Sequence, residues 1–497
     1  MGSIPKFSAT SNDFTPFVDA KNWIGGEWVT PSGKESMDVI NPRFGKAMAK
    51  VQMSTADDVA SAVRAAKAAF PSWSEWPMRE RAQIMYKFRE LMERDIVELS
   101  WLVSHENGKL FEEAKAEVLK AIECCEYGCS LPNIAGGPQL EVSRGVECRE
   151  TYAPLGVCAG ITPFNFPFMV PMWMLPQVLV GGNTFVLKPS EQVPLSTLRM
   201  AALLDEAGLP KGVFNIVNGA QEVVEAICDH PDIKAIGFVG STKVAKIVYG
   251  RAASHGKNAL CLGGAKNHLI LVPDADVDVT VDNVLASFTG CAGQRCMAAS
   301  VLLAVGDVDH LITKIAEKAK AMKVGTDVGA IVNKQSVERI VGYINDAEKR
   351  GAKVLVDGRP SAGTSDGYWV GPTILDNVSS DMPAGCEEIF GPVLSIIRVD
   401  KLDKAIAIEN NNPYGNASCI YTSNGDTARY VSNRVEAGMV GVNVGVPVPR
   451  EPFGFGGWNH SKFGNGDITG WDGFRFWTRP RKITTKWATQ RDTSWLS

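Results

Sequence analysis

The stretch VCAGITPFNFPFMVPMWMLPQVLVGGNTFVLKPS, residues 157–190, decides the predicted fold. It opens and closes with short apolar runs, at 157–162 and 184–190, each of a length typical of a buried strand. The apolar segment between them is punctuated by Pro171 and Pro176 and is long enough for a helix. A strand, a helix and a second strand in this rhythm predict a parallel βαβ unit with a right-handed crossover.

The same rhythm continues toward the C-terminus. A helix is expected at 195–207, followed by the strand VFNIVNG, a helix at 222–230 and the strand AIGFVGS at 235–241. A second region of this kind begins near Gly263, with the expected strands HLILVPD, VLSIIRV, SCIYTS and GMVGVNV. The predicted fold class is α/β, and ligands are expected at the carboxyl ends of the parallel strands.

The N-terminal third has helical periodicity. Apolar residues recur at helical spacing over 55–70, where Thr55 is a plausible N-cap with Asp58 three residues later. Two further helices are expected, one at 79–105 and one at 111–127.

Composition excludes several classes of protein. With 497 residues and 45% hydrophobic content, the chain can bury the cores of two or three domains. A formal net charge of −4 provides no basic field for nucleic acid or a membrane surface. The first fourteen residues resemble neither a secretion signal nor a transit peptide, and the apolar run at 170–180 is too short to span a bilayer.

The cysteines point to a reducing compartment. There are 11, an odd number scattered along the chain, which favours free thiols and a cytoplasmic protein. Cys124, Cys125 and Cys129 are clustered, but no histidine or second cysteine pair stands at a matching spacing. We therefore expect no metal site there, and interpret the three as small residues on a buried helix face.

Two stretches carry residues suited to attack on a carbonyl. FTGCAGQRCM, residues 288–297, holds Cys291 and Cys296 among small residues, and Arg295 could lower the pKa of the neighbouring thiol. Asn165 follows an expected strand in a loop of aromatic and proline residues, where its amide could donate to an oxyanion. Taken singly, the two stretches favour the ordinary alternatives, a buried unreactive cysteine in the first and a turn-forming asparagine in the second.

Three further turns could bind a dinucleotide. Lys188 and Glu191 follow a strand and could hold ribose hydroxyls. The turn at 237–242 ends a strand and opens a helix, so its N–H groups could meet a pyrophosphate. The turn EEIFGP at 387–392 offers a carboxylate and an aromatic ring to a nicotinamide riboside. The G-x-G-x-x-G fingerprint is absent, and each turn taken alone favours an ordinary surface turn.

In this order, the five motifs resemble those of the aldehyde dehydrogenase superfamily over nearly the whole chain. The resemblance implies a Rossmann-like NAD domain, an α/β catalytic domain and a small β oligomerisation element. It implies that Cys296 is the nucleophile and that Asn165, with the Cys296 backbone N–H, forms the oxyanion hole. The residues it implies for NAD binding are Thr162 and Phe164, together with Lys188 and Glu191 for the adenosine ribose, Ser241 for the pyrophosphate, and Glu388 with Phe390 for the nicotinamide ribose. Glu191 would repel a 2′-phosphate, which favours NAD over NADP.

The implied domains can be assigned to residue ranges. They are 1–127 with 153–262 for NAD binding, 263–474 for catalysis, and 128–152 with 475–497 for oligomerisation. In the last range RKITTKWAT alternates polar and apolar residues, which predicts a strand that joins another sheet or another subunit. A homodimer or homotetramer is expected.

The base of the hydrolytic superfamily members is missing from its motif. Those members carry a glutamate in E-L-G-G-K that activates water, whereas residues 260–268 read LCLGGAKNH. Depending on the alignment, Leu262 or Cys261 takes the glutamate position, and neither can replace a carboxylate as a base. If turnover is hydrolytic, the base would be Glu388, or Cys261 or His268 if either lies near the site.

A thiol acceptor such as coenzyme A attacks a thioester without such a base. The chain resembles the methylmalonate-semialdehyde dehydrogenase family, which works in this way, in the phrases ITPFNFPFMVPMW, GNTFVLKPSE, GAKNH, AGQRCMA, EEIFGPVLS, NNPYGN and VGVNVGVPVP. The resemblance implies oxidation of (methyl)malonate semialdehyde, loss of carbon dioxide and formation of propionyl- or acetyl-CoA.

A small anionic aldehyde requires a cation in its pocket. The resemblance gives that role to Arg295, whereas the family's second arginine is Lys120 here, a point charge rather than a fork. Arg450 is either a replacement cation or a solvated surface residue. Because of these departures, a hydrolytic enzyme for another anionic aldehyde, such as a sulfonated one, is the alternative.

Overall fold

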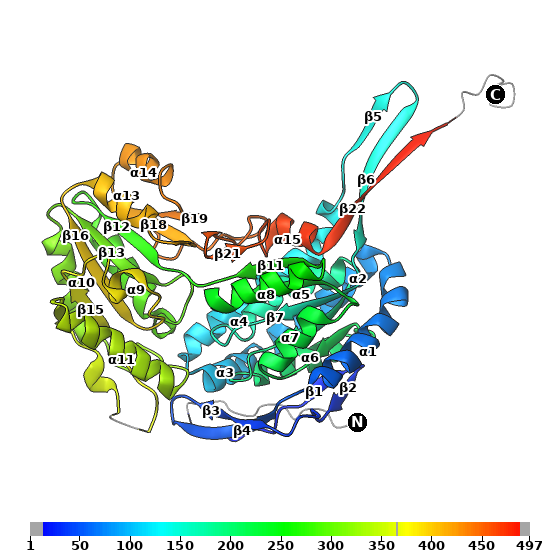
Figure 1. The fold of residues 1–497 in the computed structure, drawn as a ribbon, viewed down its shortest axis with the longest axis horizontal. Coiled ribbons are helices and arrows are strands. Elements are labelled where there is room, and N and C mark those ends of the chain that lie inside the picture. The colour runs from blue at the N-terminus through cyan, green and yellow to red at the C-terminus, as the bar shows by residue number, and fades with distance from the viewer. Residues whose placement is uncertain (1–12, 364–365, 488–497) are drawn as a thin grey trace.

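The computed structural model describes residues 13–363 and 366–487. Two α/β lobes lie side by side, and a narrow sheet projects away from them (Figure 1). The predicted α/β class is confirmed.

The N-terminal lobe is built on a sheet of eight strands in the order β2-β1-β9-β8-β7-β10-β11-β21. The strands are β1 (Asn22–Ile24), β2 (Glu27–Val29), β7 (Val157–Ile161), β8 (Thr184–Lys188), β9 (Phe214–Ile216), β10 (Ile233–Val239), β11 (Asn258–Leu262) and β21 (Lys462–Phe463). The predicted unit at 157–190 is confirmed, because β7 and β8 pair in parallel and α5 (Met169–Val180) connects them. Every residue of these two strands is buried, as expected of parallel strands with helices on both faces.

Helices cover both faces of this sheet (Figure 1). They are α1 (Ala56–Glu75), α2 (Met78–Arg94), α3 (Ile96–Asn107), α4 (Phe111–Ile134), α6 (Leu195–Glu206), α7 (Gln221–Asp229) and α8 (Thr242–Ser254), together with α5. The predicted cap of α1 is confirmed, since the backbone N–H of Thr55 donates to Asp58 Oδ2 at 3.0 Å. The third predicted helix runs further than expected, to Ile134 rather than to residue 127.

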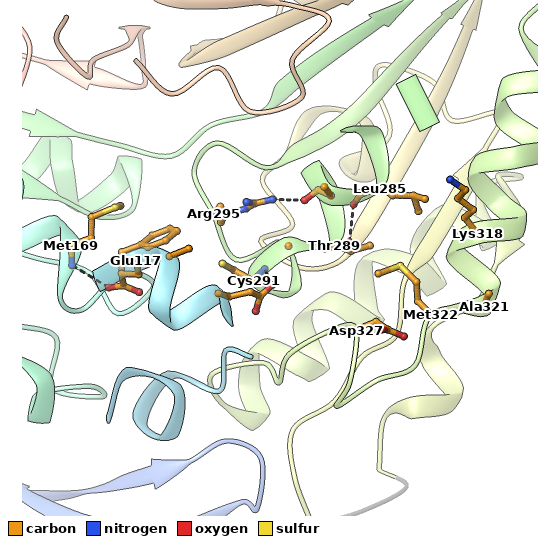
Figure 2. A pocket seen from close by; sticks show the side chains of 15 residues that line it. Glu117, Met169, Leu285, Thr289, Cys291, Arg295, Lys318, Ala321, Met322 and Asp327 are labelled. Atoms are coloured by element: carbon orange, nitrogen blue, oxygen red, sulfur yellow. Dashed lines mark hydrogen bonds between the residues drawn. The ribbon is translucent and has the colours of Figure 1, made fainter. Parts of the chain in front are cut away.

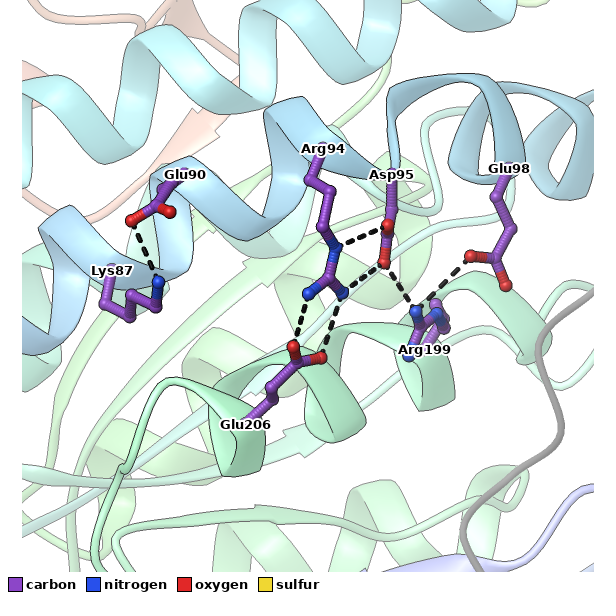
Figure 3. Close-up of polar contacts among 7 residues, drawn as sticks. All are labelled: Lys87, Glu90, Arg94, Asp95, Glu98, Arg199 and Glu206. Carbon is purple, nitrogen blue, oxygen red and sulfur yellow. Dashed lines mark hydrogen bonds and ion pairs between the residues drawn. The ribbon is translucent and has the colours of Figure 1, made fainter.

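The prediction of one helix over 79–105 is wrong, because the chain breaks at Asp95 into α2 and α3. Asp95 has φ −103° and ψ 18°, outside helical values. Its buried carboxylate accepts from Arg94 at 2.8 Å and from Arg199 of α6 at 2.6 Å, and Arg94 also pairs with Glu206 (Figure 3). A tertiary ion-pair network of this kind fixes the junction and cannot be inferred from helical periodicity.

The second lobe contains a sheet of seven strands in the order β14-β15-β16-β13-β12-β18-β19, parallel except for β14. Its strands are β12 (Asn267–Leu271), β13 (Ala299–Val305), β14 (Lys353–Val356), β15 (Thr373–Asp376), β16 (Val393–Val399), β18 (Ala417–Tyr421) and β19 (Met439–Val442). The four strands predicted here are confirmed. The helices are α9 (Val277–Thr289), α10 (Asp309–Ala321), α11 (Lys334–Lys349), α12 (Pro383–Cys386), α13 (Leu402–Asn410) and α14 (Gly425–Ser432), with short turns η1 (Gly290–Gly293) and η2 (Arg359–Ser361).

The projecting sheet has three strands in the order β22-β6-β5. They are β5 (Gln139–Ser143), β6 (Val146–Pro154) and β22 (Thr478–Lys486), the last being the predicted terminal strand. β22 pairs along its whole length with β6 of the same chain. The smaller elements are β3 (Ser36–Asn41) with β4 (Lys46–Gln52), β17 (Tyr414–Gly415) with β20 (Trp458–Asn459), and α15 (Gly470–Phe476).

Three features of the described residues bear on partners. No helix among them has the length and apolarity needed to cross a membrane. All eleven cysteines fall in the described ranges and are free thiols. Within those ranges no group of three or more His, Cys, Asp or Glu side chains is arranged to hold a metal ion, and Cys124, Cys125 and Cys129 are buried on α4.

Candidate functional site

A cavity of about 860 Å³ lies at the carboxyl ends of β7, β8 and β10 and is closed by residues of the second lobe. Its volume is in the range of about 300–1,000 Å³ typical of small-molecule and cofactor sites. Ten of the residues singled out in the sequence line it: Thr162, Phe164, Asn165, Lys188, Glu191, Ser241, Arg295, Cys296, Glu388 and Phe390. The parallel topology thus brings together motifs that are far apart in the sequence.

Cys296 is placed by the tight turn that precedes it. In η1, Cys291 and Ala292 have φ of 53° and 52°, in the left-handed region. A Cβ on Gly293 (φ 69°) would lie 2.0 Å from the carbonyl oxygen of Gly391, so only glycine fits there. After the turn, the Cys296 carbonyl accepts from the amide of Asn267 at 2.8 Å. The nucleophile candidate is therefore held by the backbone on both sides.

The thiol of Cys296 is weakly acidic without a cofactor. Burial and then the negative charge of Glu388 raise its pKa to about 12, against smaller opposing effects of Arg295 and of the backbone N–H groups of Cys296 and Met297. The thiol is therefore protonated near neutral pH. Nucleophilic attack requires a nearby cation or base to favour the thiolate.

Asn165 lies beside the cysteine loop, and its amide Nδ2 donates to the carbonyl of Gln294 at 3.1 Å. The backbone carbonyl of Asn165 accepts a hydrogen bond from the ammonium of Lys109, which also pairs with Glu117. The other oxygen of Glu117 accepts from the backbone N–H groups of Phe168, at 2.9 Å, and of the following residue. This buried ion pair fixes the loop that carries Asn165.

Sequence reasoning missed Lys109 and Glu117. Their side chains are 1% and 0% exposed. A signal was present, because Glu117 shares the buried face of α4 with Ala114 and Ala121. A charged residue on an otherwise apolar helix face is rarely buried without a partner.

The far part of the cavity suits a dinucleotide. Lys188 and Glu191 form an ion pair at 2.9 Å at the end of β8, and Ser241 stands at the N-cap of α8, where free N–H groups favour a phosphate. The hydroxyl of Thr162 faces no hydrogen-bond partner among the described residues although it is buried. An unsatisfied polar atom on the wall of a cavity this size fits a polar ligand.

The nicotinamide end of the cavity contains Glu388 and Phe390. Glu388 accepts from the backbone N–H of Ala265 at 3.0 Å, and burial raises its pKa to about 7. Phe390 has φ 54° and meets Phe164 edge-on, with ring centroids 5.8 Å apart.

The other base candidates do not line the cavity. Cys261 is fully buried in β11, and Leu262, at the alternative alignment position, is 4% exposed. His268 is buried in β12, where burial lowers its pKa to about 3. Among the candidates weighed from the sequence, only Glu388 reaches the cavity wall.

A second recess of about 790 Å³ adjoins the first cavity (Figure 2). The two cavities share Phe166, Met169 and Arg295. Cys291 lines this recess, whereas Cys296 lines the other cavity. Arg295 therefore stands in the wall between the two.

Lys120 and Arg450 line neither cavity. The ammonium of Lys120 is paired with Glu451 at 2.9 Å and with Glu123 at 3.1 Å. The Arg450 side chain is 80% exposed and approaches Glu123 only to 4.0 Å. Of the three candidate cations, the structure brings Arg295 alone to the cysteine.

Comparisons with known proteins agree with this geometry. The model of the aldehyde dehydrogenase family matches residues 28–483. Malonate-semialdehyde dehydrogenase 2 of Geobacillus kaustophilus is 46% identical over 476 residues, covering 94% of this chain and 98% of that protein. A malonate-semialdehyde dehydrogenase of Pseudomonas aeruginosa is 44% identical, covering 93% and 95%.

Solved structures give the same result. The methylmalonate-semialdehyde dehydrogenase of Oceanimonas doudoroffii superposes with a TM-score of 0.93 at 42% identity, covering 95% of this chain and 99% of that one. A Sinorhizobium meliloti protein solved in complex with NAD also has a TM-score of 0.93, at 39% identity, covering 96% of this chain and 100% of that one.

Proposed function

Since this chain belongs to the aldehyde dehydrogenase family, we propose that it uses NAD to oxidise malonate semialdehyde or methylmalonate semialdehyde and transfers the acyl group to coenzyme A. The observation that carries the proposal is the position of Arg295, next to Cys296 on the wall of the same cavity. A guanidinium there can hold the substrate carboxylate while the thiol meets the aldehyde. The malonate-semialdehyde dehydrogenases among its relatives support this substrate class.

The residues of the site have distinct tasks. The sulfur of Cys296 attacks the aldehyde carbon, and the Asn165 amide with the Cys296 backbone N–H donates to the oxygen that becomes negative. A bound NAD would supply the hydride acceptor, and loss of the hydride leaves the acyl group on the Cys296 sulfur as a thioester. The cavity that would hold NAD is lined by Thr162, Phe164, Lys188, Glu191, Ser241, Glu388 and Phe390.

The acyl acceptor follows from the missing carboxylate. At the position where hydrolytic members carry their glutamate, this chain has Leu262 or Cys261, depending on the alignment, and both residues are buried. The thiol of coenzyme A displaces the sulfur of Cys296 from the thioester without a base for water. The carboxylate leaves as carbon dioxide, so one aldehyde, one NAD and one coenzyme A give acetyl- or propionyl-CoA, carbon dioxide and NADH.

In this proposal, the positive charge of a single residue, Arg295, selects an anionic aldehyde. Lys120 is compensated by Glu451 and Glu123, and Arg450 is largely solvated. The substrate carboxylate is therefore assigned to Arg295. A sulfonate could occupy the same place, so a sulfonated aldehyde belongs in the substrate panel.

The projecting sheet is proposed as the oligomerisation element of a homodimer or homotetramer. Its strands leave Leu140 and Val142 65% and 58% exposed, and Trp487 just beyond β22 is 79% exposed. Leu140 and Val142 lie two positions apart on β5 and so share one face of that strand, and exposed apolar side chains gathered in this way are typical of an interface. The free state of all eleven cysteines supports the proposal that the protein works in the reducing cytoplasm.

The test is NADH formation from malonate semialdehyde with and without coenzyme A. We expect steady turnover only with coenzyme A, and a much lower kcat/KM for propanal, which is of similar size and uncharged. Cys296→Ala should abolish oxidation, and Cys291→Ala, in the same loop, serves as the matched control that retains it. Equal steady rates without coenzyme A would refute the proposed acceptor, and an equal preference for propanal would refute the proposed substrate class.

A further inference from the structure

The guanidinium of Arg295 lies directly against the backbone of Gly290. A Cβ built on Gly290 would stand 2.6 Å from Nη2, 2.9 Å from Cζ and 3.1 Å from Nη1 of Arg295. The first two distances are shorter than side chains tolerate. Any residue other than glycine at this position would therefore displace the guanidinium.

Arg295 is docked in this place by two carbonyls at the end of α9. Its Nη2 donates to Ala286 at 2.6 Å and to Ser287 at 3.0 Å. The C-terminal end of a helix carries partial negative charge, which stabilises a cation there. Nε of Arg295 is buried and faces no hydrogen-bond partner within the described residues, so the group has unused donor capacity.

The backbone at Gly290 does not itself require glycine. Its φ is −57° and its ψ 134°, values open to any L-residue. The turn that needs positive φ comes afterwards, at Cys291, Ala292 and Gly293. Glycine is therefore required at position 290 because the Arg295 guanidinium occupies the space of a side chain, and not because of the backbone conformation of the turn.

We infer that Gly290 is a specificity-determining residue, which admits the Arg295 guanidinium to the wall between the two cavities and so makes the site select anionic aldehydes. Gly290 lines the second recess, and Arg295, which is labelled in Figure 2, lines both cavities. Gly290 acts through Arg295 and is a positioning residue. The inference rests on the proposed function, since it concerns the charge of the same substrate.

Gly290→Ala tests the inference with little risk to folding, because the atoms in its way are the end of a flexible side chain. We expect the KM for malonate semialdehyde to rise about 10- to 100-fold, the effect of losing a well-placed charge-assisted hydrogen bond. The kcat should change less, and kcat/KM for propanal should stay within about twofold. Gly342→Ala, on α11 with open space around its Cα, is the matched control and should leave both substrates unaffected.

A double-mutant cycle separates positioning from general damage. In an Arg295→Ala background, Gly290→Ala should have no further effect on the anionic substrate. An effect of the same size in that background, or an equal rise of KM for propanal, would overturn the inference.

A binding measurement distinguishes this inference from the proposed function. Malonate, a stable dianion, should protect Cys296 of the parent protein against a small neutral disulfide reagent. Gly290→Ala should weaken that protection about 10-fold or more. If the parent protein does not oxidise malonate semialdehyde but the variant loses protection, the proposed function fails and the inference stands. Unchanged protection overturns the inference.

Discussion

Replacement of Glu388 by glutamine is expected to make Cys296 more reactive when NAD is absent. Both side chains border the same small void, and the Glu388 charge is the second cause, after burial, that raises the Cys296 pKa. Glutamine keeps the shape and the oxygen that accepts from the Ala265 N–H. The substitution therefore removes the charge and preserves the packing.

The magnitude follows from the electrostatics of a close pair. A neighbouring charge typically shifts a pKa by about 1–3 units, so removal of the Glu388 charge is expected to lower the Cys296 pKa by about two units, or about 3 kcal/mol. The thiolate population of Cys296 would rise about 100-fold. A less basic thiolate is a weaker nucleophile, with a Brønsted coefficient of about 0.4–0.5, so the net gain in rate is about tenfold.

The pH dependence gives a sharper signature than the rate alone. The pKa of Glu388 is raised to about 7, so this carboxyl is neutral well below pH 7 and charged well above it. The parent protein and Glu388→Gln should react equally at about pH 5.5 and differ about tenfold at about pH 8.5.

The assay is modification by a small neutral disulfide reagent, followed at each cysteine by peptide mass spectrometry. Cys291 is the internal control, because its pKa, raised to about 11, responds to burial, Lys109 and Glu113 but not to Glu388. Its rate should not change. An unchanged Cys296 rate at high pH, or the same ratio of rates at both pH values, would refute the reasoning.

Three further predictions concern the ion pairs and the oxyanion donor. Glu117→Gln leaves the buried Lys109 ammonium uncompensated and should reduce stability to denaturant by about 3–5 kcal/mol, so a loss under about 1 kcal/mol would contradict the role of the pair. Asn165→Ala should lower kcat about 10²- to 10³-fold in steady-state assays without weakening NAD binding measured by fluorescence, and a loss below tenfold would exclude it as an oxyanion donor. Glu191→Gln removes a partly exposed charge worth ~1 kcal/mol against a 2′-phosphate, so kcat/KM with NADP relative to NAD should rise about fivefold, and an unchanged ratio would mean that the ribose lies elsewhere.

Much of the fold could be predicted because parallel strands leave a plain record in the sequence. Strands such as β7 are buried on both faces and become continuous apolar runs. The break at Asp95 left no such record, since it depends on Arg199, which is 104 positions away. The partner of β22 was equally hidden, because β6 lies in a distant part of the sequence and none of its residues is buried.

Site residues could be predicted where a motif directly follows a strand. They could not be predicted where the direction of a side chain decides whether it reaches the cavity. Thr162, Lys188 and Ser241 reach one cavity because the topology aligns the strand ends. Lys120 was a reasonable cation from its position, but its ammonium is paired with Glu451, 331 positions away. Such a pairing appears only in the folded chain.

The space that Gly290 leaves for Arg295 is likewise a feature that appears only in the folded chain. The sequence presents two residues five positions apart, and only their packing shows that one requires the other to lack a side chain.

The thioester on Cys296 is the central claim, and it can be observed directly. The protein is mixed with malonate semialdehyde and NAD without coenzyme A, and the reaction is quenched in acid. The protein is then digested, and the mass of the peptide that contains Cys296 is measured by mass spectrometry. We predict an acyl adduct on that peptide, formed together with NADH and lost within the dead time when coenzyme A is added before the quench. NADH released over many turnovers with no adduct on Cys296, or an adduct that coenzyme A does not discharge, would contradict the account.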